Sequence, residues 1–322
     1  MISKLHISNF KSVKNLQLSC KKINLFIGEP NVGKSNILEG LSIFAVQHNL
    51  SFDGLVRFND LSNLFSENDL SNKIVVSCDE MYTEISYEKA HVTINFYKDD
   101  QFKRKFITGF QEIELTRQGS SWDFAIHPYF FKPSRNFPIL NYEFLSFPHG
   151  ENLFFLLQTN KALRNLVSEF VQERGFKLTL RQASNEIEIS KEEDGILTSY
   201  PYTIISDTLQ RIIFFIAAIE SNKKESTLIF EEPESNVFPY YTKYLAEKIA
   251  LDLGNQYFLT THNPYFLLSL IEKTPADNIG VHIVQMNERF ETDVVTLTNK
   301  GVEEVLRLGS DVFLNMDKLV DA

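Results

Sequence analysis

Short runs of apolar residues, each followed by a stretch with helical periodicity, organise this chain. The runs lie at 23–27, 228–230 and 257–259, and each leads into a segment with apolar residues three or four positions apart. Such uninterrupted runs are typical of strands that are covered on both faces, as in a parallel sheet flanked by helices. The pattern therefore predicts an α/β fold with a parallel core sheet.

A second, alternating pattern occupies 73–118. Residues 91–97 alternate between polar and apolar positions, and this period of two predicts an antiparallel layer with one face toward solvent. Further strands are expected at 4–8, 13–18, 74–76, 83–87, 102–107, 111–115, 122–126, 129–131, 281–284 and 293–297, with a hairpin at 176–180 and 186–189 and a charged turn at 191–195.

Helical periodicity predicts the remaining elements. The segment 151–173 carries a leucine-rich stripe, and 206–220 is apolar nearly all round, so the second helix should be buried. Other helices are expected at 36–44, 238–253, 265–271 and 302–308. Together the elements predict a single domain over 1–322, made of an N-terminal lobe (1–145), a helical lobe (146–225) and the C-terminal part of the core (226–322).

Composition limits the classes of function. The 322 residues include 32 Lys and Arg against 42 Asp and Glu, and the net charge of −10 argues against a broad basic surface that wraps nucleic acid. A local basic groove stays open, with 103–105 as the densest basic cluster. Cys20 and Cys78 give neither a disulfide framework nor zinc spacing. Without a signal-peptide core, and with a longest apolar run (212–219) too short to span a bilayer, we expect a cytoplasmic protein.

The sequence GEPNVGKS at 28–35 matches the phosphate-binding pattern G-x-x-x-x-G-K-[ST] and lies between a predicted strand and a predicted helix. The two glycines allow a tight turn in which backbone N–H groups face an anion, and the helix N-terminus adds its positive dipole end. Lys34 would reach the β- and γ-phosphates, and Ser35 would bind Mg²⁺. The residues expected to bind nucleotide here are Gly28, Glu29, Pro30, Asn31, Val32, Gly33, Lys34, Ser35 and Asn36.

Two later strand ends carry groups that could act on a nucleotide. Glu231 and Glu232 follow the run at 228–230, and because side chains alternate along a strand, one carboxylate could reach Mg²⁺ and the other a water. His262 follows the next buried strand, and neighbouring parallel strands share the ligand edge of a sheet. Alone, the acids could equally be solvated and the histidine could cap a helix. With the phosphate loop upstream, the pattern favours catalysis.

A serine that opens the buried helix leaves two interpretations open. The segment 206–211 reads Ser-Asp-Thr-Leu-Gln-Arg. Ser206 could form an anion site with the helix N-terminus, or it could be an ordinary N-cap. The sequence does not separate these two roles.

Taken in order, the phosphate loop, the segment 206–211, the acidic segment 231–234 and the pair 261–262 resemble the ABC-type ATPase heads of the SMC, RecF and OLD proteins. The likeness covers most of the chain, includes the N-terminal segment 5–12, and implies a P-loop NTPase fold with a helical subdomain. The roles that the resemblance implies are phosphate binding for Lys34, Mg²⁺ binding for Ser35 and Glu231, the catalytic base for Glu232, the switch histidine for His262, contact with the γ-phosphate of ATP held by the opposite subunit for Ser206, and approach to phosphate for Lys11.

The chain departs from that family's pattern in several ways. Glu231 stands where Asp is usual, and 206–211 lacks the glycine of the S-x-G pattern. Gln111 and Gln118 are the candidates for the glutamine loop. No sustained heptad pattern follows the phosphate loop, so we expect no long coiled-coil arm. With 60 residues after His262, we expect this chain to lack the C-terminal nuclease domain of full OLD proteins.

The expected function is that of an ATPase that works as a nucleotide-driven dimerisation switch, similar to the short OLD-like ATPases of bacterial phage-defence loci. The resemblance implies ATP and Mg²⁺ as cofactors, and as partners a second copy of the chain and a protein effector from a neighbouring gene; DNA binding stays open and no membrane is expected. The alternative is an ATP-binding scaffold or sensor with little hydrolysis. A GTPase is disfavoured because the Asn-Lys pair at 299–300 lacks the Asp of N-K-x-D.

Overall fold

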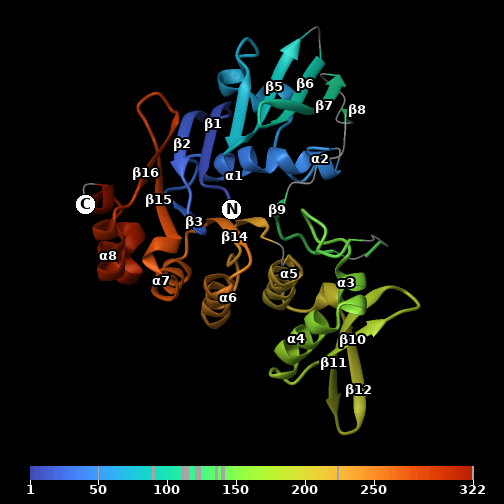
Figure 1. Ribbon diagram of the computed structural model, residues 1–322. Coiled ribbons are helices and arrows are strands. Elements are labelled where there is room, and N and C mark those ends of the chain that lie inside the picture. Colours follow the sequence, from blue (N-terminus) through green and yellow to red (C-terminus); the bar gives the residue numbers. More distant parts are fainter. Residues whose placement is uncertain are drawn as a thin grey trace.

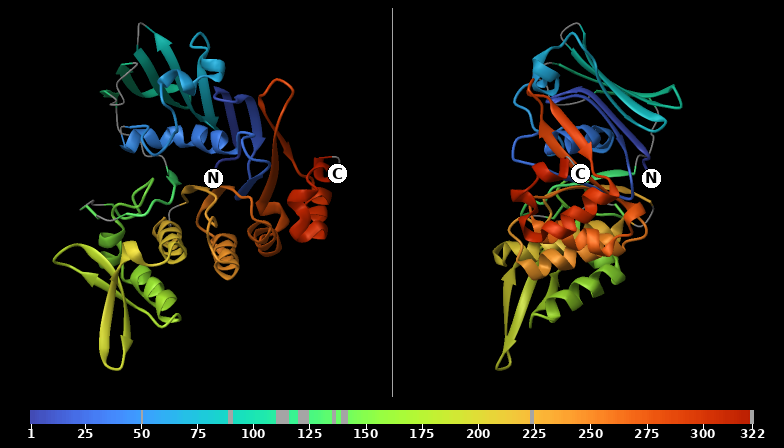
Figure 2. Two further views of the ribbon diagram at one scale, coloured as in Figure 1. Left: turned by 180° about the vertical axis from the view of Figure 1, so that it is seen from behind. Right: turned by 90° about the vertical axis from the view of Figure 1, so that its left-hand side faces the viewer.

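The computed structural model describes residues 1–49, 51–88, 91–109, 116–119, 125–134, 137–138, 142–222 and 225–320. Two sheets and their helices form successive layers (Figures 1 and 2). Helix α1 (Lys34–Ser42) lies between the sheets and contacts strands of both. Helices α5 (Asp207–Ser221), α6 (Pro239–Leu251) and α7 (Pro264–Lys273) cover the opposite face of the central sheet.

The central sheet confirms the predicted parallel core. The three apolar runs form adjacent parallel strands in which nearly every residue is buried. Only the pair β15–β16 is antiparallel among the described strands of this sheet. Across the sheet the order is β16 (Thr292–Thr296), β15 (Ile279–Met286), β3 (Ile23–Ile27), β14 (Gln256–Thr260), β13 (Thr227–Glu231) and β9 (Ile126–Tyr129).

The register of this sheet brings three loops to one edge. Glu231 at the end of β13 pairs with Thr260 at the end of β14, and Thr260 pairs with Phe26 of β3. Because parallel strands point the same way, the loops that follow β3, β13 and β14 leave the sheet side by side. The phosphate loop, the acidic pair and the histidine segment are these three loops.

The second sheet is antiparallel, as the alternating pattern predicts. In β4, burial alternates residue by residue. The two N-terminal strands also join this sheet, a placement that their short pattern did not indicate. The strand expected at 111–115, and with it Gln111, lies outside the described residues, as does most of 122–126. The order is β2 (Val13–Ser19), β1 (Lys4–Phe10), β4 (Ile74–Cys78), β5 (Met81–Glu88), β6 (His91–Lys98), β7 (Gln101–Gly109) and β8 (Thr116–Gly119).

The helical lobe corrects two predictions. The single helix expected over 151–173 is two helices, α3 (Leu153–Thr159) and α4 (Lys161–Gln172). Asn160 leaves the helical conformation and its side chain accepts a hydrogen bond from the Leu163 N–H at 3.0 Å, so it caps α4. The expected hairpin is a three-stranded sheet of β10 (Lys177–Arg181), β11 (Glu186–Glu193) and β12 (Ile196–Pro201).

The remaining helices lie where periodicity predicts them or are too short to leave a pattern. Helix α5 is buried along most of its length, as expected. None of the helices described here is long and apolar enough to cross a membrane. The others are α2 (Val46–Asn49), α8 (Asn299–Leu308) and α9 (Asp317–Val320), with 3-10 turns at Ile43–Ala45, Leu61–Leu64, Ser66–Asn68, Tyr202–Ile204, Ala276–Asn278 and Gly309–Leu314.

Candidate active site

The phosphate loop joins β3 to α1 and packs closely against the strands β15 and β16. Gly33 has φ +99°, a left-handed conformation that favours glycine. A Cβ at this position would lie 2.0 Å from Thr292 Oγ1, and a Cβ on Gly28 would lie 2.2 Å from the carbonyl oxygen of Val284. Only glycine therefore fits at positions 28 and 33. The backbone of this loop forms a cradle at the N-terminus of α1.

Lys34 is the first residue of α1, and its side chain is folded into the cradle. Its Nζ donates hydrogen bonds to the carbonyl oxygens of Gly28 at 3.0 Å and Glu29 at 2.6 Å. Burial lowers the pKa of Lys34, while the carboxylates of Glu232, Glu231 and Glu29 act in the opposite direction. A phosphate in the cradle would meet this ammonium group together with the N–H groups of the first helical turn.

Ser35 and Glu231 provide the oxygen atoms that suit a magnesium ion. The Ser35 hydroxyl donates a hydrogen bond to Glu231 Oε1, and Arg57 Nη2 lies 3.4 Å from the same oxygen. Arg57 Nε in turn donates to Glu39 Oε1 at 2.6 Å. A hydroxyl and a carboxylate in contact fit Mg²⁺, which binds few protein ligands and takes the rest from phosphate oxygens and water. Among the described residues no cluster of three or more His, Cys, Asp and Glu could hold a metal.

Glu232, which follows β13, and His262, which follows β14, face each other. His262 Nε2 lies 3.1 Å from Glu232 Oε1, and both side chains remain partly open to solvent. Glu232 has φ +42°, and its N–H donates to Thr260 Oγ1 at 3.1 Å while Ser235 Oγ donates to its carboxylate at 2.9 Å. Burial and then the charge of Lys34 lower the pKa of His262, against the effect of Glu232. The lowered pKa favours the neutral imidazole.

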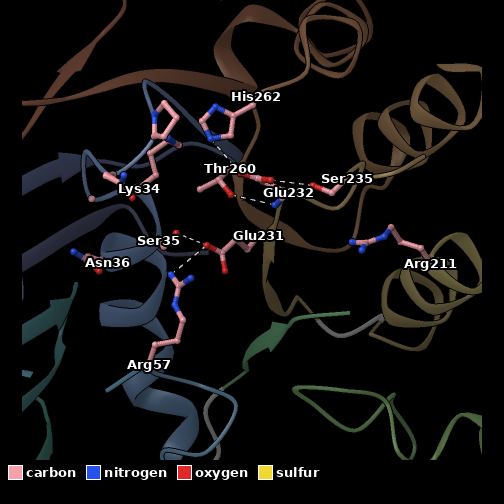
Figure 3. A pocket seen from close by; sticks show the side chains of 13 residues that line it. Lys34, Ser35, Asn36, Arg57, Arg211, Glu231, Glu232, Ser235, Thr260 and His262 are labelled. Carbon is pink, nitrogen blue, oxygen red and sulfur yellow. Dashed lines mark hydrogen bonds and ion pairs between the residues drawn. The ribbon is translucent and has the colours of Figure 1, made fainter. Parts of the chain in front are cut away.

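These groups line one cavity of about 670 Å³ (Figure 3), a volume typical of small-molecule sites. The predicted catalytic and metal-binding side chains therefore lie together. The sequence motifs do not include Arg57, Ser235 and Thr260, and they assign no role to Arg211. Figure 3 shows the guanidinium of Arg211 pointing from α5 toward the cavity. The lining residues are Pro30, Asn31, Gly33, Lys34, Ser35, Asn36, Arg57, Arg211, Glu231, Glu232, Ser235, Thr260 and His262.

Other residues expected in the site do not line this cavity. Lys11 Nζ bonds the Glu39 carboxylate and the carbonyl oxygen of Arg57, the latter at 2.5 Å. Lys11 therefore lines a neighbouring cavity, which it shares with Arg57 and Glu231. Ser206 is an exposed N-cap of α5 whose hydroxyl accepts from the Leu209 N–H at 3.3 Å. The side chain of Gln118 is outside what the structure describes.

Of the remaining loop residues, Gly28, Glu29 and Val32 contribute backbone carbonyl oxygens, whereas Asn36 uses its side chain. Val32 is buried, and its carbonyl oxygen accepts a hydrogen bond from Thr292 Oγ1 at 3.0 Å. Asn36 Nδ2 donates to Ser12 Oγ at 2.7 Å, which ties the start of α1 to the turn between β1 and β2. Gly28 and Glu29 contribute the carbonyl oxygens that hold Lys34.

Residues 23–269 match the protein family described as “AAA domain, putative AbiEii toxin, Type IV TA system”. The chain belongs to this family. The matched region of this AAA domain includes the whole cavity. No curated protein sequence matched the chain.

Solved structures share the fold of this chain. An SMC head bound to the C-terminal winged-helix domain of ScpA has a TM-score of 0.55 and 15% identity, covering 93% of this chain and 98% of that one. An SMC head with an extended coiled coil, bound to the C-terminal domain of ScpA derived from Pyrococcus furiosus, has a TM-score of 0.52 and 13% identity, with 95% and 98% covered. The predicted fold, a P-loop NTPase of the ABC-type ATPase head class, is confirmed.

Proposed function

We propose that this AAA domain binds ATP with Mg²⁺ and hydrolyses it, and that ATP brings two copies of the chain together. The observation that supports the proposal is the convergence of Lys34, the Ser35–Glu231 pair and the Glu232–His262 pair on one cavity. Phosphate cradle, oxygen ligands and a candidate base are the parts that phosphoryl transfer to water requires.

Each group has a role that follows from its surroundings. Lys34 and the N-terminus of α1 would hold the terminal phosphates. Mg²⁺ held by Ser35 and Glu231 would neutralise phosphate charge. The Glu232 carboxylate would accept the proton of the attacking water, and the neutral His262 beside it would orient that water or the γ-phosphate.

Pairing of two copies would complete the site. Ser206 is exposed at the start of α5, and it does not line its own chain's cavity. The cavity also opens to solvent, so a second copy could approach it and offer Ser206 to the nucleotide. The similar SMC heads carry bound ScpA domains, which supports a protein partner for this chain in general terms. A role in phage defence with an effector from a neighbouring gene remains a prediction from the resemblance.

The test is the variant Glu232→Gln, which keeps the shape of the side chain and removes the base. We expect phosphate release to fall at least about 100-fold, as is common when a general base is lost. We also expect sedimentation to show an ATP-dependent dimer that persists in the variant. Glu247→Gln is a matched control, because Glu247 pairs with Lys273 on α7 outside the cavity. A chain that stays monomeric at saturating ATP, in wild type and variant alike, would exclude the switch.

A second candidate function is an ATP-binding scaffold with little hydrolysis. Two observations favour it: the hydroxyl of Ser206 is used in capping α5, and the carboxylate of Glu231 is shared with Arg57. In that case ATP binds tightly, phosphate release by the wild type is no faster than by Glu232→Gln, and the two proteins assemble alike.

A further inference from the structure

Glu234 is a buried carboxyl group next to the cavity that none of the roles above uses. It lies three residues after Glu231, in the turn between β13 and α6, and 3% of its surface is exposed. It does not line the cavity. Burying a carboxyl group is costly unless a hydrogen-bond donor meets it, so the partner of this group shows what it holds.

The side-chain partner of Glu234 is Thr261, the residue before His262, and the backbone of His262 also hydrogen-bonds this carboxyl group. Thr261 Oγ1 donates a hydrogen bond to Glu234 Oε1 and accepts one from the Asn263 N–H at 2.9 Å. Asn263 caps α7, with its side chain accepting from Tyr265 and Phe266. The Thr261 hydroxyl therefore ties Glu234 to the turn that carries His262.

Contacts from the turn after β13 reach three consecutive residues, 260–262, at the end of β14 and after it. Glu232 contacts Thr260 through its N–H and His262 through its carboxylate, and Glu234 contacts Thr261, which lies between those two residues. The Thr260 and His262 contacts face the cavity, whereas the Thr261 contact lies on the buried side, where it is shielded from water and stronger for that reason.

We propose that Glu234 is a positioning residue, which fixes Thr261 from the buried side and so holds His262 beside Glu232. Glu234 does not touch the nucleotide. The inference rests on the proposed function for its kinetic consequence, while the placement of His262 can be measured without nucleotide.

The experiment compares two ways of removing the same hydrogen bond, Glu234→Leu and Thr261→Val, with Glu234→Gln, which keeps an acceptor oxygen. Thr261→Val is nearly isosteric, and the Thr261 backbone stays bound to the carbonyl oxygen of Phe26. Glu234→Leu leaves no buried carboxyl group without a donor, and Thr261→Val keeps the packing, so each variant covers the case in which the other does not fold. Thr242→Val is a matched control, because Thr242 is also buried but lies on α6 away from the cavity.

The first measurement is the NMR titration of His262 in protein without nucleotide, assigned with His262→Gln. Burial lowers the pKa of His262 in the wild type. When the hydrogen bond is lost, the ring gains water, so we expect its pKa to rise toward that of free histidine in both variants. Glu234→Gln and Thr242→Val should titrate as the wild type does.

The second measurement is ATP turnover. We expect kcat to fall about tenfold or more in Glu234→Leu and Thr261→Val, since small misplacements of catalytic groups have effects of this size, with ATP affinity unchanged within about twofold. Glu234→Gln should restore kcat.

Unchanged His262 titration and kcat in both hydrogen-bond variants would overturn the inference, as would a Glu234→Gln protein as impaired as Glu234→Leu. A wild-type chain that does not hydrolyse ATP contradicts the proposed function instead, and the titration then decides the positioning role alone.

Discussion

Three carboxyl groups within four residues have different surroundings and therefore different properties. Glu231 bonds Ser35 and lies near Arg57, Glu232 faces His262, and Glu234 is buried. Burial raises the pKa of Glu234 to about 7. The sequence alone, with Glu-Glu-Pro-Glu at 231–234, gives no sign of this difference, since it depends on which neighbour each turn brings near.

The raised pKa of Glu234 predicts a pH-dependent stability. Between the ordinary carboxyl pKa of 4.5 and about 7, the folded chain binds a proton that the unfolded chain has released, so stability falls as pH rises through this window. The shift corresponds to about 3 kcal/mol of unfolding free energy. Glu234→Gln removes this loss. We therefore expect the variant to gain stability relative to wild type between pH 5 and pH 8, as measured by urea unfolding. The prediction would be contradicted if the difference in unfolding free energy between variant and wild type were the same at pH 5 and at pH 8.

At the scale of elements, the strands that build the site were predictable and several of their neighbours were not. The strands β3, β13 and β14 are continuous apolar runs, because both of their faces are covered. The break at Asn160 was missed because the leucine stripe continues across it. Strand β12 was missed because it is exposed on both faces and so carries no alternation.

In the candidate site, too, residues within sequence motifs were predictable and residues brought near by tertiary packing were not. Loop and strand-end motifs indicated Lys34, Glu232 and His262, because each follows an apolar run within a few residues. Arg57 comes from a polar segment without periodicity, and reaches Glu231 through the packing of the layers. Such a contact across 174 positions leaves no local pattern.

A variant of Ser206 can distinguish between its two possible roles, the N-cap of α5 and a contact with nucleotide. Ser206→Ala removes the acceptor for the Leu209 N–H and should cost about 1 kcal/mol of unfolding free energy. Thr298→Ala is a matched control, because Thr298 caps α8 by accepting from the Gly301 N–H at 3.2 Å, away from the cavity. If Ser206 also contacts nucleotide across a dimer, Ser206→Ala alone should weaken ATP-dependent assembly in sedimentation. Equal assembly by both variants would leave Ser206 a cap and nothing more.

At the scale of the whole molecule, the cavity lies where several layers meet. Its lining comes from α1 on one side of the central sheet, from the ends of β13 and β14 within it, and from α5 on the other side. A ligand there would contact elements on both faces of the central sheet, so its binding should stabilise the entire fold.

Mg²⁺ and ATP at 100 times the dissociation constant should therefore raise the unfolding free energy by about 2.7 kcal/mol. Lys34→Ala should remove most of this gain, because it deletes the ammonium group that the phosphates would meet, and Lys22→Ala should not, since Lys22 lies outside the cavity. Thermal or urea unfolding with and without ligand measures the effect. Stabilisation of Lys34→Ala equal to that of wild type would contradict the placement of the phosphates.

The order of strands in the central sheet has a consequence for biosynthesis. The strand before the phosphate loop, β3, has β14 and β15 as its two neighbours, and both are synthesised more than 200 residues later. While the chain emerges from the ribosome, β3 must therefore wait without its hydrogen-bonding partners, as an apolar segment open to chaperones or to wrong pairing. The capacity to hold a nucleotide is thus one of the last properties that a newly made chain acquires.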